Sequence, residues 1–273
     1  MKCNFSRLAG DNVGIRWLAC LLGTALSCSS PERIDRTTTD RTDPPAVRTA
    51  LPVERIAIVG ASVSAGFGGA PFGEAFTAAA KRSSVETFAD LFLFRDPIGE
   101  SRTQIDKAIA FKATTIVGLD LLFWAVYRST DRTWRDQALA SAFGDLERAR
   151  ATGAWIVIGD VPHVVTASEL LIAKQSVPDA ATLAGYNETI AAWARDRERV
   201  LLVPFASWAE PLAAGGEIEI APGERVPAQT LVSPDGLHVN LLGAWALLDR
   251  LDKWIELRLP GTPKDALVFV RPR

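Results

Sequence analysis

Cysteine is nearly absent from this 273-residue chain, and its three copies all fall within the first 28 residues, at Cys3, Cys20 and Cys28. Histidine is also scarce, with only His163 and His238. From residue 29 onward there is therefore no thiol for disulfides, cysteine catalysis or cysteine-ligated metal. Because His-x-x-x-His and Glu-x-x-His spacings are absent too, we expect neither a catalytic metal nor any other metal cofactor.

An excess of charge of one sign is lacking as well. The chain has 30 Lys and Arg against 32 Asp and Glu, which leaves a formal net charge of −2. Such a balance gives no electrostatic reason to expect nucleic acid as a partner. Because 48% of the residues are hydrophobic, the composition argues against global disorder and allows one large domain with a sizeable core, or two small ones.

The first 28 residues have the pattern of an export signal. Basic Lys2, Arg7 and Arg16 precede the uncharged stretch WLACLLGTALSC, which ends at Cys28 and is too short to span a bilayer comfortably. Its end, TALSC, resembles a bacterial lipoprotein signal, with Ala25 where Leu is usual. The resemblance implies export, lipidation of Cys28 and a membrane anchor in the cell envelope. Simple cleaved secretion and an uncleaved anchor are the alternatives.

A polar stretch rich in Pro and Thr, residues 29–52, is predicted to be a flexible linker to a domain spanning residues 53–273. In that domain short apolar runs alternate with longer helical stretches. Strands are predicted over 55–59, part of 86–94, 114–119, 155–159 and 200–204, and helices over 73–82, 101–112, 133–153, 180–198 and 240–259. The alternation predicts an α/β fold with a mostly parallel five-stranded sheet and helices on both faces. Residues 215–232 break the rhythm and are predicted to be a loop or small hairpin.

The stretch IVGASVSAGFG follows the first predicted strand, at the sheet edge where α/β proteins bind ligands. A phosphate-binding loop is one interpretation. However, Gly60, Gly66 and Gly68 do not have dinucleotide spacing, and a Gly-Lys-Ser/Thr motif is absent. The other interpretation is a turn that presents a nucleophile, Ser62 or Ser64, and it requires a base within reach.

His238 lies in SPDGLHVN, three residues after Asp235. Across a tight turn, this carboxylate can accept the Nδ1 proton and leave Nε2 facing a serine. An Asp that caps the turn beside an exposed His accounts for the spacing equally well. His163 also follows a predicted strand, and it is interpreted as a rim residue or a substrate contact.

Together, GASVSAG near the start of the domain and DGLH before its last helix resemble the SGNH (GDSL-type) hydrolases over residues 55–259. Ala61 stands where that family usually has Asp. The resemblance implies a three-layer α/β/α domain of flavodoxin-like architecture, with Ser62 as nucleophile, His238 as base and Asp235 as orienting acid. It implies hydrolysis of a small-molecule acyl ester through an acyl-enzyme, with no cofactor.

The resemblance also implies an oxyanion site. In the family, the donors are the serine N–H, a Gly N–H after the second strand and an Asn side chain after the third, which correspond here to Ser62, Gly99 and Asp120. An ionised carboxylate cannot donate, and loss of one donor typically costs about 2.7–4 kcal/mol of barrier. Three explanations stay open. Asp120 is protonated through burial, or it points to Arg128 or the backbone, or the domain is degenerate and binds an acylated glycan or lipid.

Overall fold

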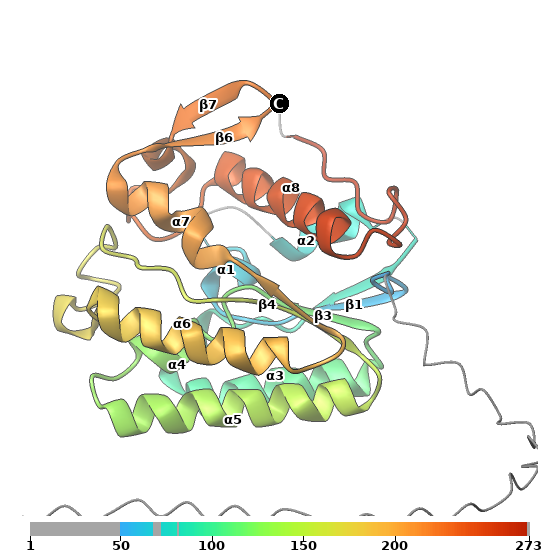
Figure 1. The fold of residues 1–273 in the computed structure, drawn as a ribbon, viewed down its shortest axis with the longest axis horizontal. Helices are drawn as coiled ribbons and strands as arrows, with labels where there is room; N and C mark the ends of the chain where they lie inside the picture. Colours follow the sequence, from blue (N-terminus) through green and yellow to red (C-terminus); the bar gives the residue numbers. More distant parts are fainter. Residues whose placement is uncertain (1–49, 68–71, 81, 272–273) are drawn as a thin grey trace, which may run out of the picture. The chain divides into compact units, whose positions relative to one another are not determined.

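Five parallel strands form the centre of the domain. The computed structural model describes residues 50–67, 72–80 and 82–271, so the expected signal, the Cys28 lipidation site and nearly all of the expected linker lie outside the described residues. The sheet has the order β2-β1-β3-β4-β5, and every pairing is parallel (Figure 1). The strands are β1 (Arg55–Ile58), β2 (Ser84–Thr87), β3 (Thr115–Gly118), β4 (Trp155–Gly159) and β5 (Val200–Val203). The predicted parallel five-stranded sheet is confirmed.

The central strands are apolar because both of their faces are covered. Every residue of β3 and β4 is buried, whereas the edge strand β2 is largely exposed. In β1, Ile56 and Ile58 join the hydrophobic cluster on one face of the sheet, and Ala57 joins the cluster on the other. This explains why the inner strands have continuous apolar runs rather than alternating ones.

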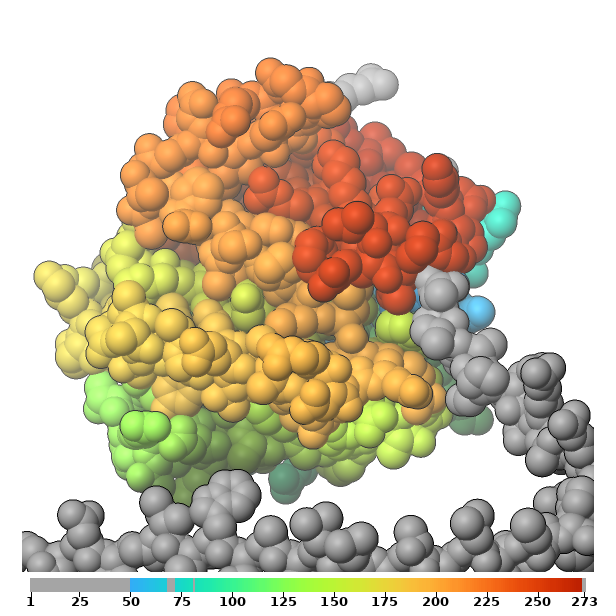
Figure 2. Space-filling model, in the orientation of Figure 1, coloured from blue at the N-terminus to red at the C-terminus, as the bar shows by residue number. Residues whose placement is uncertain are grey.

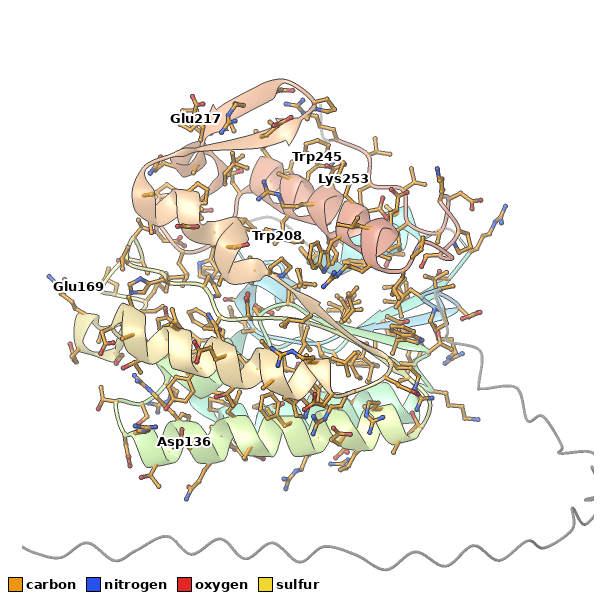
Figure 3. The ribbon with its side chains drawn as sticks, in the orientation of Figure 1. Asp136, Glu169, Trp208, Glu217, Trp245 and Lys253 are labelled. Atoms are coloured by element: carbon orange, nitrogen blue, oxygen red, sulfur yellow. The ribbon has the colours of Figure 1, made fainter. Side chains whose placement is uncertain are left out.

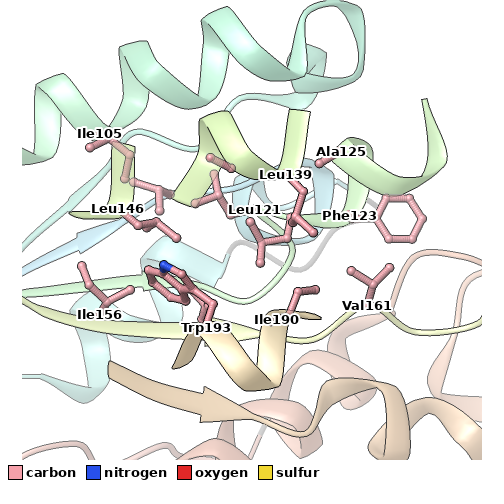
Figure 4. Close-up of a cluster of buried hydrophobic side chains, with 14 of the residues drawn as sticks. Ile105, Leu121, Phe123, Ala125, Leu139, Leu146, Ile156, Val161, Ile190 and Trp193 are labelled. Atoms are coloured by element: carbon pink, nitrogen blue, oxygen red, sulfur yellow. The ribbon is translucent and has the colours of Figure 1, made fainter. Parts of the chain in front are cut away.

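Helices cover both faces of the sheet, which gives the predicted three layers (Figure 1). One face carries α3 (Pro97–Ala110), α4 (Phe123–Tyr127), α5 (Arg132–Ala151) and α6 (Ala180–Arg195), and the other carries α2 (Phe72–Ala79) and α8 (Leu241–Arg258). Figure 4 shows the core of the first face, where Ile105, Leu146 and Trp193 from α3, α5 and α6 surround Ile156 of β4.

Asp or Asn residues fix where four of these helices begin. The side chains of Asp96, Asp131, Asp179 and Asn240 each accept a hydrogen bond from a backbone N–H in the first turn of α3, α5, α6 and α8. The predicted helix over 101–112 therefore starts earlier, at Pro97, a favoured first position. The predicted strand within 86–94 is cut short because Asp90 caps the 3₁₀ helix η1 (Leu91–Arg95).

The segment between β5 and α8 contains one element that the sequence did not predict. Helix α7 (Phe205–Ala214) contains Pro211, which is unusual inside a helix. It is followed by an antiparallel hairpin of β6 (Glu217–Ala221) and β7 (Glu224–Pro227), as predicted for residues 215–232. In Figure 2 the orange surface of α7 and the hairpin adjoins the red surface of α8.

Three short helices complete the described chain: α1 (Ser62–Ala65) and the 3₁₀ helices η2 (Lys174–Ser176) and η3 (Ala228–Leu231). Within the described residues, every helix is too short or too polar to cross a bilayer.

Candidate active site

Ser62 is presented by a sharp turn directly after β1, which we call the nucleophile turn (residues 60–64). Gly60 has a φ of +137°, and a Cβ at this position would lie 2.1 Å from Oδ1 of Asp120. Glycine is therefore required both for the backbone conformation and for the space. Ser62 follows as the first residue of α1, with its side chain partly exposed at the carboxyl edge of the sheet.

Asp235 and His238 lie on a compact loop before α8, which we call the acid–base loop (residues 233–239). The loop is closed by the Ser233 N–H, which donates to the carbonyl oxygen of His238 at 2.7 Å. Inside it, Oδ1 of Asp235 accepts hydrogen bonds from the backbone N–H groups of Leu237 and His238, each at 2.9 Å. These bonds account for the three-residue spacing, because they fold the imidazole back onto the carboxylate.

The two segments meet in a continuous hydrogen-bonded chain. Nε2 of His238 lies 2.8 Å from Oγ of Ser62, and Nδ1 lies 2.8 Å from Oδ2 of Asp235. An ionised carboxylate only accepts hydrogen bonds, so we assign the imidazole proton to Nδ1. This tautomer leaves the Nε2 lone pair facing the Ser62 hydroxyl, the arrangement required for a general base.

Asp235 suits the role of the ionised partner. Partial burial raises the pKa of its carboxyl, but the hydrogen bonds from the backbone and side chain of His238 and from Leu237 outweigh that effect and hold the pKa below its ordinary value. The His238 side chain is buried, and the edge of one ring meets the face of the other between His238 and Phe67, with centroids 4.5 Å apart. Phe67 therefore shields the imidazole from water.

Asp120 is placed differently from its predicted role. Its Oδ1 accepts from the N–H of Ala61 at 3.0 Å and from Oγ of Ser64 at 2.5 Å, and its Oδ2 accepts from the N–H groups of Val63 and Ser64 at 2.9 and 3.3 Å. Burial raises the pKa of the Asp120 carboxyl, and these hydrogen bonds oppose the shift. Both oxygens act as acceptors for the nucleophile turn, so Asp120 points to the backbone and does not fit a role as oxyanion donor.

This arrangement leaves one backbone donor of the turn unused. Asp120 takes the N–H groups of Ala61, Val63 and Ser64, whereas the Ser62 N–H has no acceptor among the described residues. The predicted role of Ser62 in an oxyanion site is compatible with this geometry. Gly99 is not, because it lies in the first turn of α3 and its N–H donates to Oδ1 of Asp96 at 3.0 Å.

Ser64, the alternative nucleophile, is buried and bonded to Asp120, and it makes no hydrogen bond with His238. A residue that we did not predict, Gln104, also holds the nucleophile turn. Its Oε1 accepts from the Gly60 N–H at 2.7 Å and its Nε2 donates to the Gly60 carbonyl at 3.1 Å. The signal available in the sequence was a polar residue beside Ile105, on the apolar side of a predicted helix.

The acid–base loop is supported by the long loop between β4 and α6, the β4–α6 loop (residues 160–179). Oγ1 of Thr166 donates to the carbonyl oxygen of Gly236 at 2.8 Å, and the Ser168 N–H donates to the carbonyl oxygen of Asp235 at 2.8 Å. The loop is itself held by Tyr127, whose hydroxyl donates to the Pro162 carbonyl oxygen at 2.8 Å. Burial raises the pKa of Tyr127 to about 12, so this hydroxyl keeps its proton.

His163 lies in the β4–α6 loop, partly exposed, and makes no hydrogen bond among the described residues. It is not part of the Ser62–His238–Asp235 chain. Within residues 50–67, 72–80 and 82–271, no group of three or more His, Cys, Asp or Glu side chains is arranged to hold a metal ion.

A comparison with solved structures identifies the fold. TesA aligns with a TM-score of 0.51 and 20% identity, covering 76% of this chain and all of its own. A GDSL-like lipase from Bacteroides thetaiotaomicron aligns with a TM-score of 0.52 and 13% identity, covering 76% of this chain and 92% of its own. The acetylxylan esterase Axe2 from Geobacillus stearothermophilus aligns with a TM-score of 0.51 and 12% identity, covering 83% of this chain and 100% of its own.

No protein-family model and no curated protein matches the sequence. The likeness therefore concerns the fold, and the chain has the α/β/α fold of the SGNH hydrolases, with sheet order 2-1-3-4-5.

Proposed function

We propose that this chain, which has the fold of the SGNH hydrolases, is a serine ester hydrolase. The observation that carries the proposal is the hydrogen-bonded chain from Ser62 through His238 to Asp235, with both distances at 2.8 Å. Ser62 is separated from Asp235 and His238 by more than 170 residues in sequence, so their alignment depends on the whole fold. The structural neighbours, among them a GDSL-like lipase and an acetylxylan esterase, support the same reaction class.

In the proposed reaction, His238 Nε2 takes the Ser62 Oγ proton as Oγ attacks the carbonyl carbon of an acyl ester. Asp235 stabilises the resulting imidazolium through Nδ1. The tetrahedral intermediate collapses, the ester C–O bond breaks, and His238 returns the proton to the leaving alcohol. Water then attacks the Ser62 acyl-enzyme by the same route and releases a carboxylic acid. No cofactor takes part.

The Ser62 N–H is the proposed backbone donor for the developing oxyanion. Asp120 supports it indirectly, because it binds the neighbouring N–H groups and fixes the orientation of the peptide planes around Ser62. With no Asn side chain at position 120, we expect a modest turnover compared with an enzyme that has three donors.

Replacement of Ser62 by Ala tests the function. We expect loss of p-nitrophenyl acetate hydrolysis by at least about 10³-fold with unchanged thermal unfolding. Ser207→Ala is a matched control, because Ser207 lies outside the hydrogen-bonded chain and bonds only to the Pro204 carbonyl. Hydrolysis that survives in the Ser62 variant would refute the nucleophile assignment.

A second candidate function is a domain that binds an acylated glycan or lipid with little turnover. The orientation of Asp120 favours it, since the side chain at this position offers no donor to an oxyanion. A fluorophosphonate probe separates the two functions. Covalent labelling at Ser62 shows an activated serine, whereas well-folded protein that stays unlabelled supports the binding role.

The cellular setting is part of the same proposal. We expect export, lipidation at Cys28 and a membrane anchor in the bacterial cell envelope. The expectation rests on the TALSC ending and on the uncharged stretch before it. Mass spectrometry of the mature N-terminus tests this. An unmodified terminus at any residue other than Cys28 would contradict the anchor.

A further inference from the structure

Large apolar side chains are exposed mainly around the candidate active site. Ten such side chains are exposed among the described residues. Three of them, Leu257, Val268 and Val270, belong to the end of α8 and the C-terminal segment. The other seven lie in segments that follow the carboxyl ends of strands or the acid–base loop: Phe67, Phe92, Phe94, Val165, Leu170, Leu171 and Leu241. We call these seven the apolar rim.

The apolar rim reaches the catalytic groups at Phe67. Phe67 contacts the His238 ring. In η1, Phe92 and Phe94 lie 6.2 Å apart between ring centroids, and Phe94 lies 5.6 Å from Trp124. The β4–α6 loop is bonded to the acid–base loop through Thr166 and Ser168, which are close in sequence to Val165, Leu170 and Leu171.

The β4–α6 loop is the most prominent part of the apolar rim. Leu170 is 97% exposed, and Val165 and Leu171 in the same loop are also exposed. Several exposed apolar side chains in one segment are more informative than a single one. Figure 3 places the neighbouring Glu169 at the outer edge of the molecule, and in Figure 2 the same yellow segment protrudes. The apolar rim thus includes side chains in a protruding loop next to the acid–base loop.

The occupant of this surface must cover the rim and still leave an ester within reach of Ser62. A protein partner seated on the rim would close the site, whereas a bilayer satisfies both conditions, since its molecules carry the ester themselves. From this, and resting on the proposed esterase function, we propose that the apolar rim docks on a lipid surface and that the substrate is an acyl ester held in that surface.

The number of residues between the proposed anchor and the domain is compatible with this orientation. The described chain begins at residue 50, and the carbonyl of Pro52 is bonded to Thr115 at the start of β3, at the amino edge of the sheet opposite the site. Residues 29–49 can reach about 70 Å when extended, and a domain of this size is roughly 45 Å across. Residues 29–49 are therefore long enough for the carboxyl edge of the sheet, which carries the site, to face the membrane.

Charge does not determine the docking. Arg95 lies over the Phe92 ring, 4.1 Å from its centroid, and Lys174 is exposed in the β4–α6 loop, but Glu169 and Asp96 are close to them in sequence. Because the charges balance, we expect contact through apolar side chains, with binding to zwitterionic lipid that is insensitive to salt.

A site-specific label tests the docking in the full chain. Cys3, Cys20 and Cys28 are the only cysteines, so a chain with these replaced by Ala can carry one new thiol. An environment-sensitive dye at Leu170→Cys should shift to the blue with phosphatidylcholine vesicles and be quenched by a lipid-borne quencher. The matched control, Leu257→Cys, should show neither change, although it is also exposed.

A second variant tests the apolar contacts themselves. Phe92→Ser with Phe94→Ser should weaken vesicle binding about tenfold and leave hydrolysis of soluble p-nitrophenyl acetate unchanged. Equal dye responses at positions 170 and 257 would overturn the docking, as would a dye response caused by self-association without lipid. If the dye responds as expected but no ester is hydrolysed, the docking stands and the proposed function fails.

Discussion

The nucleophile turn and the acid–base loop follow the same plan but have different supports. Each contains a glycine that has a positive φ and packs closely against a supporting residue. Gly60 packs against Asp120, and Gly236 packs against Thr166. Each also gathers neighbouring backbone N–H groups on one carboxylate, that of Asp120 or Asp235. Short polar turns at a sheet edge are thereby fixed without long stretches of regular structure.

The difference lies in where the support comes from. The nucleophile turn is held by Asp120, which follows β3, and by Gln104 of α3; the two residues are 6% and 1% exposed. The acid–base loop is held by its own carboxylate, whose side chain is 25% exposed, and by the β4–α6 loop. We infer that the serine is fixed in position by the core, whereas the imidazole has some freedom to adjust during proton transfer.

The largest expected effect comes from the acid–base loop. Asp235→Asn keeps an oxygen for the Leu237 and His238 N–H groups but turns an NH₂ toward Nδ1. The imidazole proton then moves to Nε2, which can no longer accept the Ser62 proton. We expect kcat to fall by about 10⁴-fold, measured with p-nitrophenyl acetate.

The same variant has a defined pH dependence. The pKa of Asp235 is lowered on folding, so its contribution to stability is complete above the ordinary value and is lost only as pH falls through the lowered one. The stability difference between the two proteins, about 1 kcal/mol for this partly exposed group, should therefore persist down to about pH 4 and disappear only below it, as the Asp235 carboxyl becomes protonated. A difference that has already disappeared at about pH 5 would contradict a lowered pKa of Asp235.

Replacement of the two glycines by Ala sharpens the comparison. A Cβ at Gly60 would lie 2.1 Å from buried Asp120, whereas a Cβ at Gly236 would lie 2.0 Å from the carbonyl oxygen of Thr166 in a loop. The two clashes are similar, but only the loop can move. We expect losses of about 3–5 kcal/mol for Gly60→Ala and about 1–2 kcal/mol for Gly236→Ala in urea unfolding. Equal losses would show that the two supports are equally rigid.

The sequence was sufficient to predict the sheet and the meeting of Ser62, Asp235 and His238. The strands are apolar runs buried on both faces, a pattern that depends on few long-range details. The Asp235–His238 spacing is local, because the turn between them is closed by its own hydrogen bonds. Their contact with Ser62 was implied by the resemblance to the SGNH hydrolases and not by the topology, because the acid–base loop follows η3 and not a strand of the parallel sheet.

What the sequence could not predict is side-chain direction across distant segments. Asp120 was aligned with an oxyanion donor, but its direction depends on three N–H groups some 56 to 59 residues away. Gly99 was predicted as an oxyanion donor that precedes the helix over 101–112, because Asp96 was not recognised as the cap of a helix that begins at Pro97. α7 was missed because Pro211 lowers the helical tendency of its sequence.

The remaining variant, Asp120→Asn, tests whether this carboxylate supports the nucleophile turn or impairs the oxyanion site. An Asn offers one oxygen to a turn that presents four donors to the carboxylate, so at least one buried N–H loses its acceptor. We expect a loss of about 1–3 kcal/mol in the free energy of unfolding, together with a lower kcat. The control Asp131→Asn removes a charge at the exposed cap of α5 and should change neither, since Asn caps helices as well as Asp does. A rate increase in Asp120→Asn would instead mean that an amide at this position reaches the oxyanion, and that the carboxylate limits the rate.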